Sequence, residues 1–261
     1  MEADVMTKRM RLDKMLANMG CGTRSEIKTA VRQGKVTVGG FTVQDSGLQI
    51  DPEADEVEFD GQKVRFREVV YLLMNKPQGV VSATEDTRER TVLDLLKPED
   101  RVLQPFPAGR LDKDTVGLLL LTNDGRMAHE LLSPRKHVDK TYEALVSGTV
   151  DEADRQAFAA GVTLDDGYVT MPAELTVLRT DAHFDAGTEP VSEISLTIRE
   201  GKFHQVKRMF EAVGKKVLFL KRVAMGPLKL DERLAPGSYR ELSAEELEAL
   251  KSLKSHRGRG R

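Results

Sequence analysis

The chain has 261 residues, of which 39% are hydrophobic and 31% are charged, and its formal net charge at pH 7 is −2. That balance is typical of a globular protein with a hydrophobic core and one or two domains. The single cysteine, Cys21, excludes an internal disulfide, and the five histidines lack the paired spacing of metal ligands. No segment resembles a signal peptide or the roughly 20-residue apolar run of a membrane helix, so we expect a cytoplasmic protein.

Charge is distributed unevenly along the chain. Residues 8–35 contain eight bases and two acids, whereas residues 36–62 contain seven acids and no base. Residues 251–261 contain five bases and no acid. Separate basic zones of this kind indicate a polyanionic partner, with solvated surface charge as the alternative.

The first 43 residues are predicted to form two helices and a hairpin. Apolar residues recur at helical spacing over residues 12–19, and Gly20 ends that helix. Thr23 and Glu26 have the spacing of a capping box, which begins a second helix. Residues 35–43 then alternate around a Gly-Gly pair, which predicts a tight hairpin.

The second predicted helix carries a basic stripe. Arg24, Lys28 and Arg32 lie at i, i+4 and i+8 and therefore share one face, while apolar residues occupy the opposite face. A stripe of this kind can meet phosphates without reading base sequence.

The remainder of the chain alternates strands and turns with a few helices. Strands are predicted at residues 70–74, 116–121, 140–146, 193–199 and 216–223, and helices at 91–96, 203–213 and after Ser243. This pattern predicts an α+β fold with a mostly antiparallel mixed sheet and flanking helices. We place a small first domain at residues 1–62, a linker at 63–69, a larger domain at 70–250 and a basic disordered tail at 251–261.

The segment from Gly109 to Gly125 is the most informative one for chemistry. Arg110 and Asp112 lie in a polar loop directly before a continuous apolar strand, and a rigid strand end is a good place to hold a carboxylate. From this pattern alone, a surface Arg–Asp ion pair is the competing interpretation.

Several segments together resemble the pseudouridine synthase family. Residues 109–125 resemble its catalytic motif, with Asp112 at the position of the essential aspartate. The segment from Lys140 to Tyr142 resembles the motif of the active-site tyrosine, and residues 200–209 resemble the motif with the basic partner of the aspartate. Residues 74–79 match the start of the catalytic domain. The N-terminal module resembles the alpha-L RNA-binding domain at Arg11–Lys14, Gly20, Arg24–Ser25, Gly34–Val36 and Gly39–Gly40.

The resemblance implies a cofactor-free isomerase that converts a uridine in RNA to pseudouridine. Asp112 is implied to be the catalytic carboxylate and Lys207 its basic partner. Tyr142 is expected to stack on the target uracil, and Arg110 to help hold that base outside the RNA stack. The competing roles are a core tyrosine for Tyr142 and an ion-pair partner of Asp112 for Arg110.

Helix geometry independently favours Lys207 as the residue that faces a site. At about 100° per residue, the apolar residues from Phe203 to Val213 span one arc, with Lys207 at its edge and Arg208 nearly opposite. Arg208 is therefore expected to face solvent or phosphate. A lysine that extends to solvent from a core margin is the alternative for Lys207.

RNA binding is expected to be shared between the N-terminal module and the segment around Lys207. The candidate residues are Arg9, Arg11, Lys14, Arg24, Lys28, Arg32, Lys35, Lys202, His204, Gln205 and Arg208. We expect His204 to be structural or to face RNA rather than to be catalytic.

The expected substrate is ribosomal RNA. Within the family, residues 204–209 are closest to ribosomal small-subunit pseudouridine synthase A, which implies 16S rRNA or a small-subunit assembly intermediate as the partner of a monomeric enzyme. One alternative keeps the chemistry and moves the substrate to 23S rRNA. Two different functions compete with this one: a non-catalytic RNA- or ribosome-binding protein, and a glycosidic hydrolase, although glycosidases usually need two opposed carboxylates.

Overall fold

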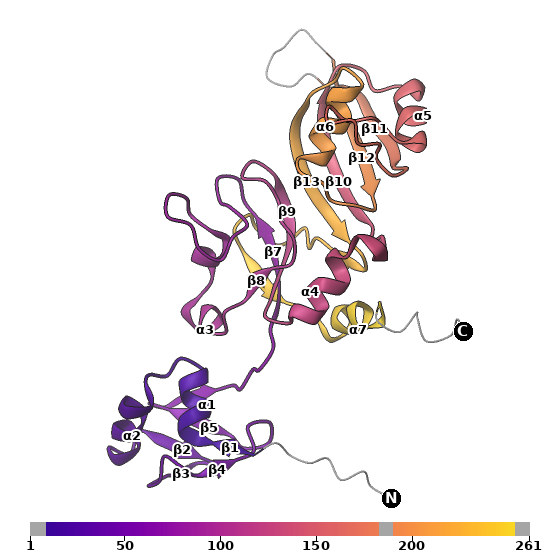
Figure 1. Ribbon diagram of the computed structural model, residues 1–261. Coiled ribbons are helices and arrows are strands. Elements are labelled where there is room, and N and C mark those ends of the chain that lie inside the picture. The colour runs from indigo at the N-terminus through magenta and orange to yellow at the C-terminus, as the bar shows by residue number, and fades with distance from the viewer. Residues whose placement is uncertain (1–8, 183–189, 254–261) are drawn as a thin grey trace, which may run out of the picture. The chain divides into compact units, whose positions relative to one another are not determined.

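The computed structural model describes residues 9–182 and 190–253. The chain forms two compact units (Figure 1). The first comprises Met1–Val70 and Leu96–Pro105, and the second comprises Tyr71–Leu95 and Phe106–Arg261. Within the described residues, no helix has the length and apolar character required to cross a membrane.

The first unit packs short helices on small antiparallel sheets. Its elements are β1 Met10–Arg11, α1 Leu12–Asn18, α2 Arg24–Arg32, β2 Val36–Val38, β3 Phe41–Thr42, β4 Gln49–Ile50, β5 Val57–Phe59, β6 Gln62–Val64 and α3 Pro98–Arg101. The two predicted helices and the β2–β3 hairpin are confirmed. The predicted capping box is present, because Thr23 N donates to Glu26 Oε2 at 2.7 Å and Glu26 N donates to Thr23 Oγ1 at 3.3 Å.

The end of the first unit differs from the expected organisation in two ways. Strand β6, at Gln62–Val64, extends into the segment expected to be a linker, because it pairs with β5 across the Asp60–Gly61 turn. The segment from Leu96 to Pro105 also joins this unit. An ion pair from Arg67 Nη1 to Asp100 Oδ1 at 2.6 Å ties it there. Contacts between residues so distant in the chain leave no local sequence pattern.

The second unit is built on one mixed sheet. Its elements are β7 Tyr71–Lys76, η1 Val92–Leu95, β8 Phe106–Pro107, β9 Val116–Thr122, α4 Gly125–Leu132, η2 Pro134–Lys136, β10 Lys140–Ser147, α5 Glu152–Ala160, β11 Glu174–Ala182, β12 Val191–Ile198, α6 Gln205–Ala212, β13 Val217–Met225, β14 Leu228–Lys229, β15 Tyr239–Glu241 and α7 Ala244–Ser252. The strand order is β11-β12-β10-β13-β9-β7-β15. The strand pairs of this sheet are antiparallel except β9–β13, so the predicted mostly antiparallel sheet is confirmed.

A close backbone approach joins the two halves of this sheet. Strands β9 and β13 pair through Val116 with Lys221 and through Gly117 with Arg222. A Cβ on Gly117 would lie 2.3 Å from the Arg222 carbonyl oxygen, and Gly117 has a φ of +100°. Only glycine fits here, which explains the glycine inside an otherwise apolar strand.

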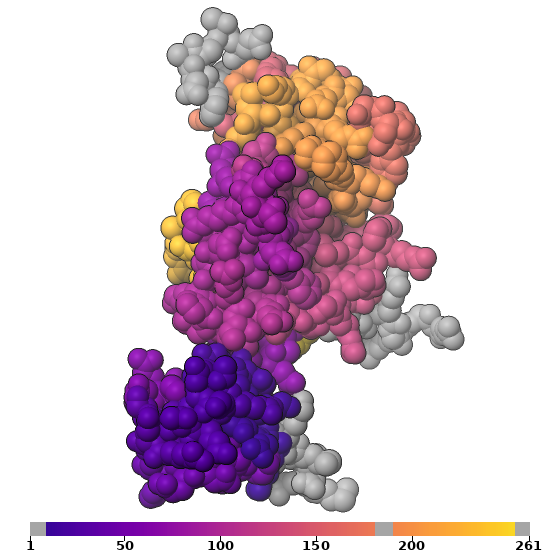
Figure 2. Space-filling view, turned by 60° about the vertical axis from the view of Figure 1, so that its left-hand side comes forward, coloured from indigo at the N-terminus to yellow at the C-terminus, as the bar shows by residue number. Residues whose placement is uncertain are grey.

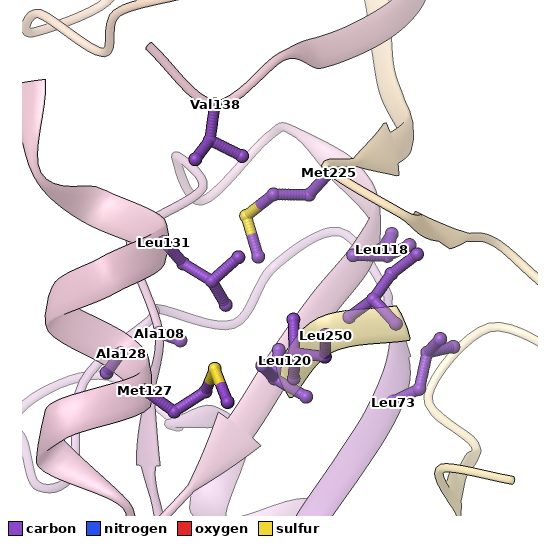
Figure 3. Close-up of a cluster of buried hydrophobic side chains, with 11 residues drawn as sticks. Leu73, Ala108, Leu118, Leu120, Met127, Ala128, Leu131, Val138, Met225 and Leu250 are labelled. Atoms are coloured by element: carbon purple, nitrogen blue, oxygen red, sulfur yellow. The ribbon is translucent and has the colours of Figure 1, made fainter. Parts of the chain in front are cut away.

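Helices α4 and α7 cover the β7–β9 half of the sheet (Figure 3). Helix α4 begins at Asp124, whose side chain accepts a hydrogen bond from Met127 N at 3.0 Å, as expected of a capping residue. The buried cluster combines β7, β9, α4 and α7 through Leu73, Leu118, Leu120, Met127, Leu131 and Leu250. Helix α7 runs through Ser252, so the first residues of the expected basic tail are helical, and residues 254–261 lie outside the described part of the chain.

Helices α5 and α6 belong to the β10–β13 half. The rings of Phe158 in α5 and Phe210 in α6 are both fully buried, with centroids 4.8 Å apart. In the space-filling view, the salmon and orange atoms of this half lie against one another (Figure 2). Helix α6 begins at Gln205 rather than at the expected Phe203, so Phe203 lies outside its apolar arc and is 74% exposed.

Candidate active site

Two buried side chains form hydrogen bonds with the backbone of the loop before β9. The Lys76 ammonium group donates to the carbonyl oxygens of Asp112 at 3.0 Å and Thr115 at 2.9 Å. Ser82 Oγ donates to the Leu111 carbonyl oxygen at 2.9 Å. Lys76 is 0% exposed, and burial lowers its pKa to about 8. These contacts fix the backbone that carries Asp112.

Helix α6 and the residue that precedes it bring two side chains to the Asp112 carboxylate. Lys207 Nζ lies 3.2 Å from Asp112 Oδ2, and His204 Nε2 lies 3.5 Å from Asp112 Oδ1. The Asp112 side chain is 31% exposed and is therefore accessible from solvent. The structure thus brings Asp112 and Lys207 together, as the helix geometry predicted, and adds His204 to the pair.

Lys207 is shared with a second carboxylate, that of Asp114, two residues after Asp112. Lys207 Nζ lies 2.6 Å and 2.9 Å from the two carboxylate oxygens of Asp114. Burial opposes the charged form of Lys207, but its hydrogen bonds to Asp114 and Asp112 outweigh burial and raise its pKa. The same hydrogen bond from Lys207 lowers the pKa of Asp114. Both groups are therefore charged at neutral pH.

Tyr142 is positioned by strand register. It lies on β10, is 8% exposed, and pairs with Leu196 on β12 and with Arg222 on β13. Arg222 in turn pairs with Gly117 at the start of β9, five residues after Asp112. One strand therefore separates the strand of Tyr142 from the strand that follows Asp112.

Arg222 is a buried cation that the sequence did not single out. It is 2% exposed, and its Nε donates to the Leu118 carbonyl oxygen at 2.8 Å. Among the described residues, its Nη2 atom has no hydrogen-bond partner. Its sequence context did not distinguish it, because the predicted strand at residues 216–223 also contains Lys216 and Lys221.

Arg110 is exposed and forms no ion pair with any described residue. The competing role, an ion-pair partner of Asp112, is therefore not seen within residues 9–182 and 190–253. The Arg110 side chain is therefore accessible from solvent.

The segment before α6 is organised around Glu200, which is 7% exposed. Glu200 accepts hydrogen bonds from Tyr168 Oη and from Gln205 Nε2, both at 2.6 Å. Gln205, expected to contact RNA, is only 4% exposed. Its side-chain amide also accepts a hydrogen bond from Lys202 N at 2.8 Å, so it stabilises the turn before α6 rather than facing RNA. The Lys202 ammonium group lies 4.4 Å above the centre of the Tyr168 ring.

Arg208, expected to face solvent or phosphate, is instead paired within the protein. Its Nε donates to Asp165 Oδ1 at 2.7 Å, and its Nη2 lies 2.7 Å from Asp166 Oδ2. These acids occupy a tight turn, in which Gly167 N donates to the Leu164 carbonyl oxygen.

The basic candidates of the first unit fall into two groups. Arg24, Lys28 and Arg32 are exposed along α2, and among the described residues none of them forms an ion pair. In contrast, Arg11 pairs with Asp13 at 2.7 Å and Lys35 lies 3.7 Å from Asp60. Arg9 and Lys14 are also exposed. The stripe on α2 is therefore available to phosphates, as are Arg9 and Lys14.

The fold and the site together define a class of protein. An accessible carboxylate, held by a lysine beside a strand that carries a buried tyrosine, suits nucleophilic or proton-transfer chemistry. A separate unit with an exposed basic stripe suits a polyanionic substrate. These features fit the class of enzymes that act on nucleic acid.

Comparison with known proteins shows the family. Residues 70–212 match the RNA pseudouridylate synthase family, and residues 10–57 match the S4 domain. The chain belongs to the RNA pseudouridylate synthase family and is an isomerase that converts uridine to pseudouridine in RNA. The S4 match covers the segment in which the sequence resembled an alpha-L RNA-binding domain.

Similar proteins share nearly the whole length of the chain. An uncharacterized RNA pseudouridine synthase, YtzG of Bacillus subtilis, is 52% identical over 92% of this chain and 98% of its own. Ribosomal small subunit pseudouridine synthase A of Yersinia pestis is 41% identical over 91% and 97%, and ribosomal large subunit pseudouridine synthase B of Bacillus subtilis is 39% identical over 94% and 97%. A crystal structure of a pseudouridylate synthase is 38% identical, with a TM-score of 0.62 over 92% of this chain and 99% of that one.

Proposed function

We propose that this enzyme isomerises a specific uridine of ribosomal RNA and that Asp112 is its catalytic carboxylate. The observation that carries the proposal is the accessible Asp112 side chain held between Lys207 and His204. A charged carboxylate is the form that can act as nucleophile or base.

The reaction requires no group beyond the substrate and the protein. The bond from N1 of uracil to C1′ of the ribose breaks, and a bond from C5 to C1′ forms. The hydrogen on C5 leaves to solvent, and N1 takes up a proton, so atoms and charge balance. In this scheme Tyr142 stacks on the uracil, and Lys207 holds Asp112 in position. Exposed Arg110 is free to fill the gap that the extruded uridine leaves.

The proposed substrate is 16S rRNA, bound by a monomer. It is supported by residues 204–209, which are closest to the small-subunit group within the family. Overall identity does not separate the two targets, because a relative named for the large subunit is 39% identical and one named for the small subunit is 41% identical. 23S rRNA is therefore the second candidate, and mapping pseudouridines in both rRNAs from cells that lack this gene separates them.

The catalytic assignment is tested by isosteric substitution of each carboxylate that shares Lys207. Asp112→Asn and Asp114→Asn each remove one carboxylate that contacts Lys207. We expect Asp112→Asn to abolish tritium release from RNA labelled at C5 of uridine, with loss of at least about 10⁴-fold in rate. Asp114→Asn should retain activity within about tenfold, because Lys207 can still pair with Asp112. Equal loss in both variants, or full turnover of Asp112→Asn, would contradict the assignment.

A further inference from the structure

Phe203 is an exposed aromatic residue beside the candidate site, and it takes no part in the proposed reaction. Its side chain is 74% exposed, whereas Phe158 and Phe210 in the same unit are fully buried. An exposed large apolar residue on a globular surface is informative when its position is fixed and it lies at a functional site.

The position of Phe203 is fixed by a tight turn. Gln205 N donates to the Lys202 carbonyl oxygen at 3.2 Å, and Lys202 N donates to Gln205 Oε1 at 2.8 Å. Phe203 and His204 are the two central residues of this turn. His204 has a φ of +47°, a left-handed conformation that is uncommon for a residue with a side chain. The buried Gln205–Glu200 hydrogen bond anchors the turn to the fold.

The ring of Phe203 stacks on the ring of its neighbour, His204. The Phe203 and His204 rings stack with centroids 3.7 Å apart and an angle of 19° between their planes. His204 Nε2 is in turn 3.5 Å from Asp112 Oδ1. One stacked ring therefore connects the exposed phenylalanine to the carboxylate, which places Phe203 at the edge of the site.

We propose that Phe203 is a stacking platform for the base of a nucleotide next to the target uridine. When a uridine is extruded from structured RNA, each base beside it loses a stacking neighbour, and a fixed aromatic face can replace that neighbour. Tyr142 does not serve this purpose, because its proposed partner is the target uracil itself. The inference rests on the proposed function of Asp112.

The surroundings of Phe203 favour a base over a phosphate. Of the two cations nearby, Arg208 is paired with Asp165 and Asp166, and the Lys202 ammonium group lies 4.4 Å above the centre of the Tyr168 ring. An uncharged ring face binds any of the four bases through its π-system, so Phe203 should contribute affinity without strong sequence selection.

Steady-state kinetics on labelled rRNA test the proposal. Phe203→Leu keeps an apolar side chain and removes the ring, whereas Phe203→Tyr keeps the ring. We expect Phe203→Leu to reduce kcat/KM by about 5- to 100-fold, the range for loss of one base–aromatic stack, with most of the change in KM. Phe203→Tyr should stay within about twofold of the parent. Equal kinetics of Phe203→Leu and the parent would overturn the proposal.

The chain contains no tryptophan, which allows a direct optical test in the full-length protein. Phe203→Trp places a single indole at the proposed platform, and Leu178→Trp places one at an exposed position on β11 as a control. Addition of the rRNA transcript should quench the fluorescence of Phe203→Trp and leave Leu178→Trp within about 10% of its starting value. Equal responses of the two variants would contradict base stacking at residue 203.

Two further outcomes separate the possible reasons for failure. If the parent protein releases no tritium from any rRNA, the proposed function fails, whatever residue 203 does. If the parent is active and the indole of Phe203→Trp becomes buried without RNA as the protein concentration rises, a second copy of the chain covers Phe203 and the inference is wrong.

A further test uses the RNA itself, once the modified uridine is mapped. An abasic nucleotide beside that uridine should weaken RNA binding by the parent and leave RNA binding by Phe203→Leu unchanged.

Discussion

The buried Lys76 side chain supports the loop that carries Asp112, although it is not itself one of the candidate active-site groups. Its ammonium group is 0% exposed and donates to backbone carbonyls on both sides of the turn that begins at Asp112. A buried cation is costly unless such acceptors surround it. In the sequence, Lys76 is part of the segment that resembles the start of the catalytic domain. Its role as a support of the Asp112 loop depends on hydrogen bonds to residues that lie 36 and 39 positions further along the chain.

Lys76→Met is expected to lower the free energy of unfolding by about 2–4 kcal/mol at pH 7, because two buried carbonyl groups lose their donor. The effect should grow with pH. The pKa of Lys76 is about 8 in the fold and 10.5 as a free side chain, so between these values the unfolded chain binds more protons and the wild type gains stability as pH rises.

Urea denaturation of Lys76→Met and the wild type at pH 7 and pH 9.5 measures this effect. The difference between them should increase by about 1 kcal/mol per pH unit above pH 8. Lys63→Met, at an exposed position, is the control and should show no such trend. A pH-independent difference for Lys76→Met would contradict the depressed pKa.

At the scale of elements, helix α6 depends on the segment that precedes it. The helix carries Lys207, and its first turn is tied to Glu200, which also accepts hydrogen bonds from Tyr168 Oη and from Met171 N at 2.9 Å. The hairpin around residue 166 and the start of α6 therefore share one buried carboxylate. Sequence periodicity predicted the helix but placed its start two residues early, because the turn at Phe203 and His204 continues the apolar spacing.

Glu200→Ala should destabilise this region, because it leaves buried donors without an acceptor. We expect a loss of about 2–4 kcal/mol in the free energy of unfolding, together with faster amide exchange over residues 200–206. Glu211→Ala removes an exposed glutamate from the same helix and should change stability by less than about 0.5 kcal/mol. Similar effects of the two substitutions in chemical denaturation would show that the buried carboxylate does not organise the helix start.

At the scale of the whole molecule, the two family matches lie in different units. The S4 match lies in the first unit, and the RNA pseudouridylate synthase match lies almost entirely in the second. Electrostatic contacts of a basic stripe with phosphates supply affinity without sequence selection, so a division of labour between the two units is physically reasonable.

Replacing Arg24, Lys28 and Arg32 together by alanine is expected to weaken rRNA binding and to leave the second unit folded. If each residue meets one phosphate, the slope of log affinity against log salt should fall by about 2–3 in magnitude. The control removes Lys63, Arg155 and Lys251, three exposed cations that are each paired with an acid. Affinity titrations at several salt concentrations should separate the two triple variants, and identical slopes would exclude the stripe as a phosphate site.

Interactions between residues a few positions apart account for the features that could be predicted from the sequence. The capping boxes at Thr23–Glu26 and Ser243–Glu246, the Gly39–Gly40 hairpin and the buried strand β9 all depend on such local interactions, and all are present. Helix spacing also placed Lys207 on the side of α6 that meets Asp112.

Long-range contacts carry the rest of the site. Lys207 is 95 residues from Asp112 and 93 from Asp114, and Arg222 is 104 from Leu118. Three features arise only when distant segments pack together: the lysine shared by two carboxylates, the buried arginine, and the return of residues 96–105 to the first unit. They could not be predicted from the sequence, because such packing leaves no periodic pattern in the chain.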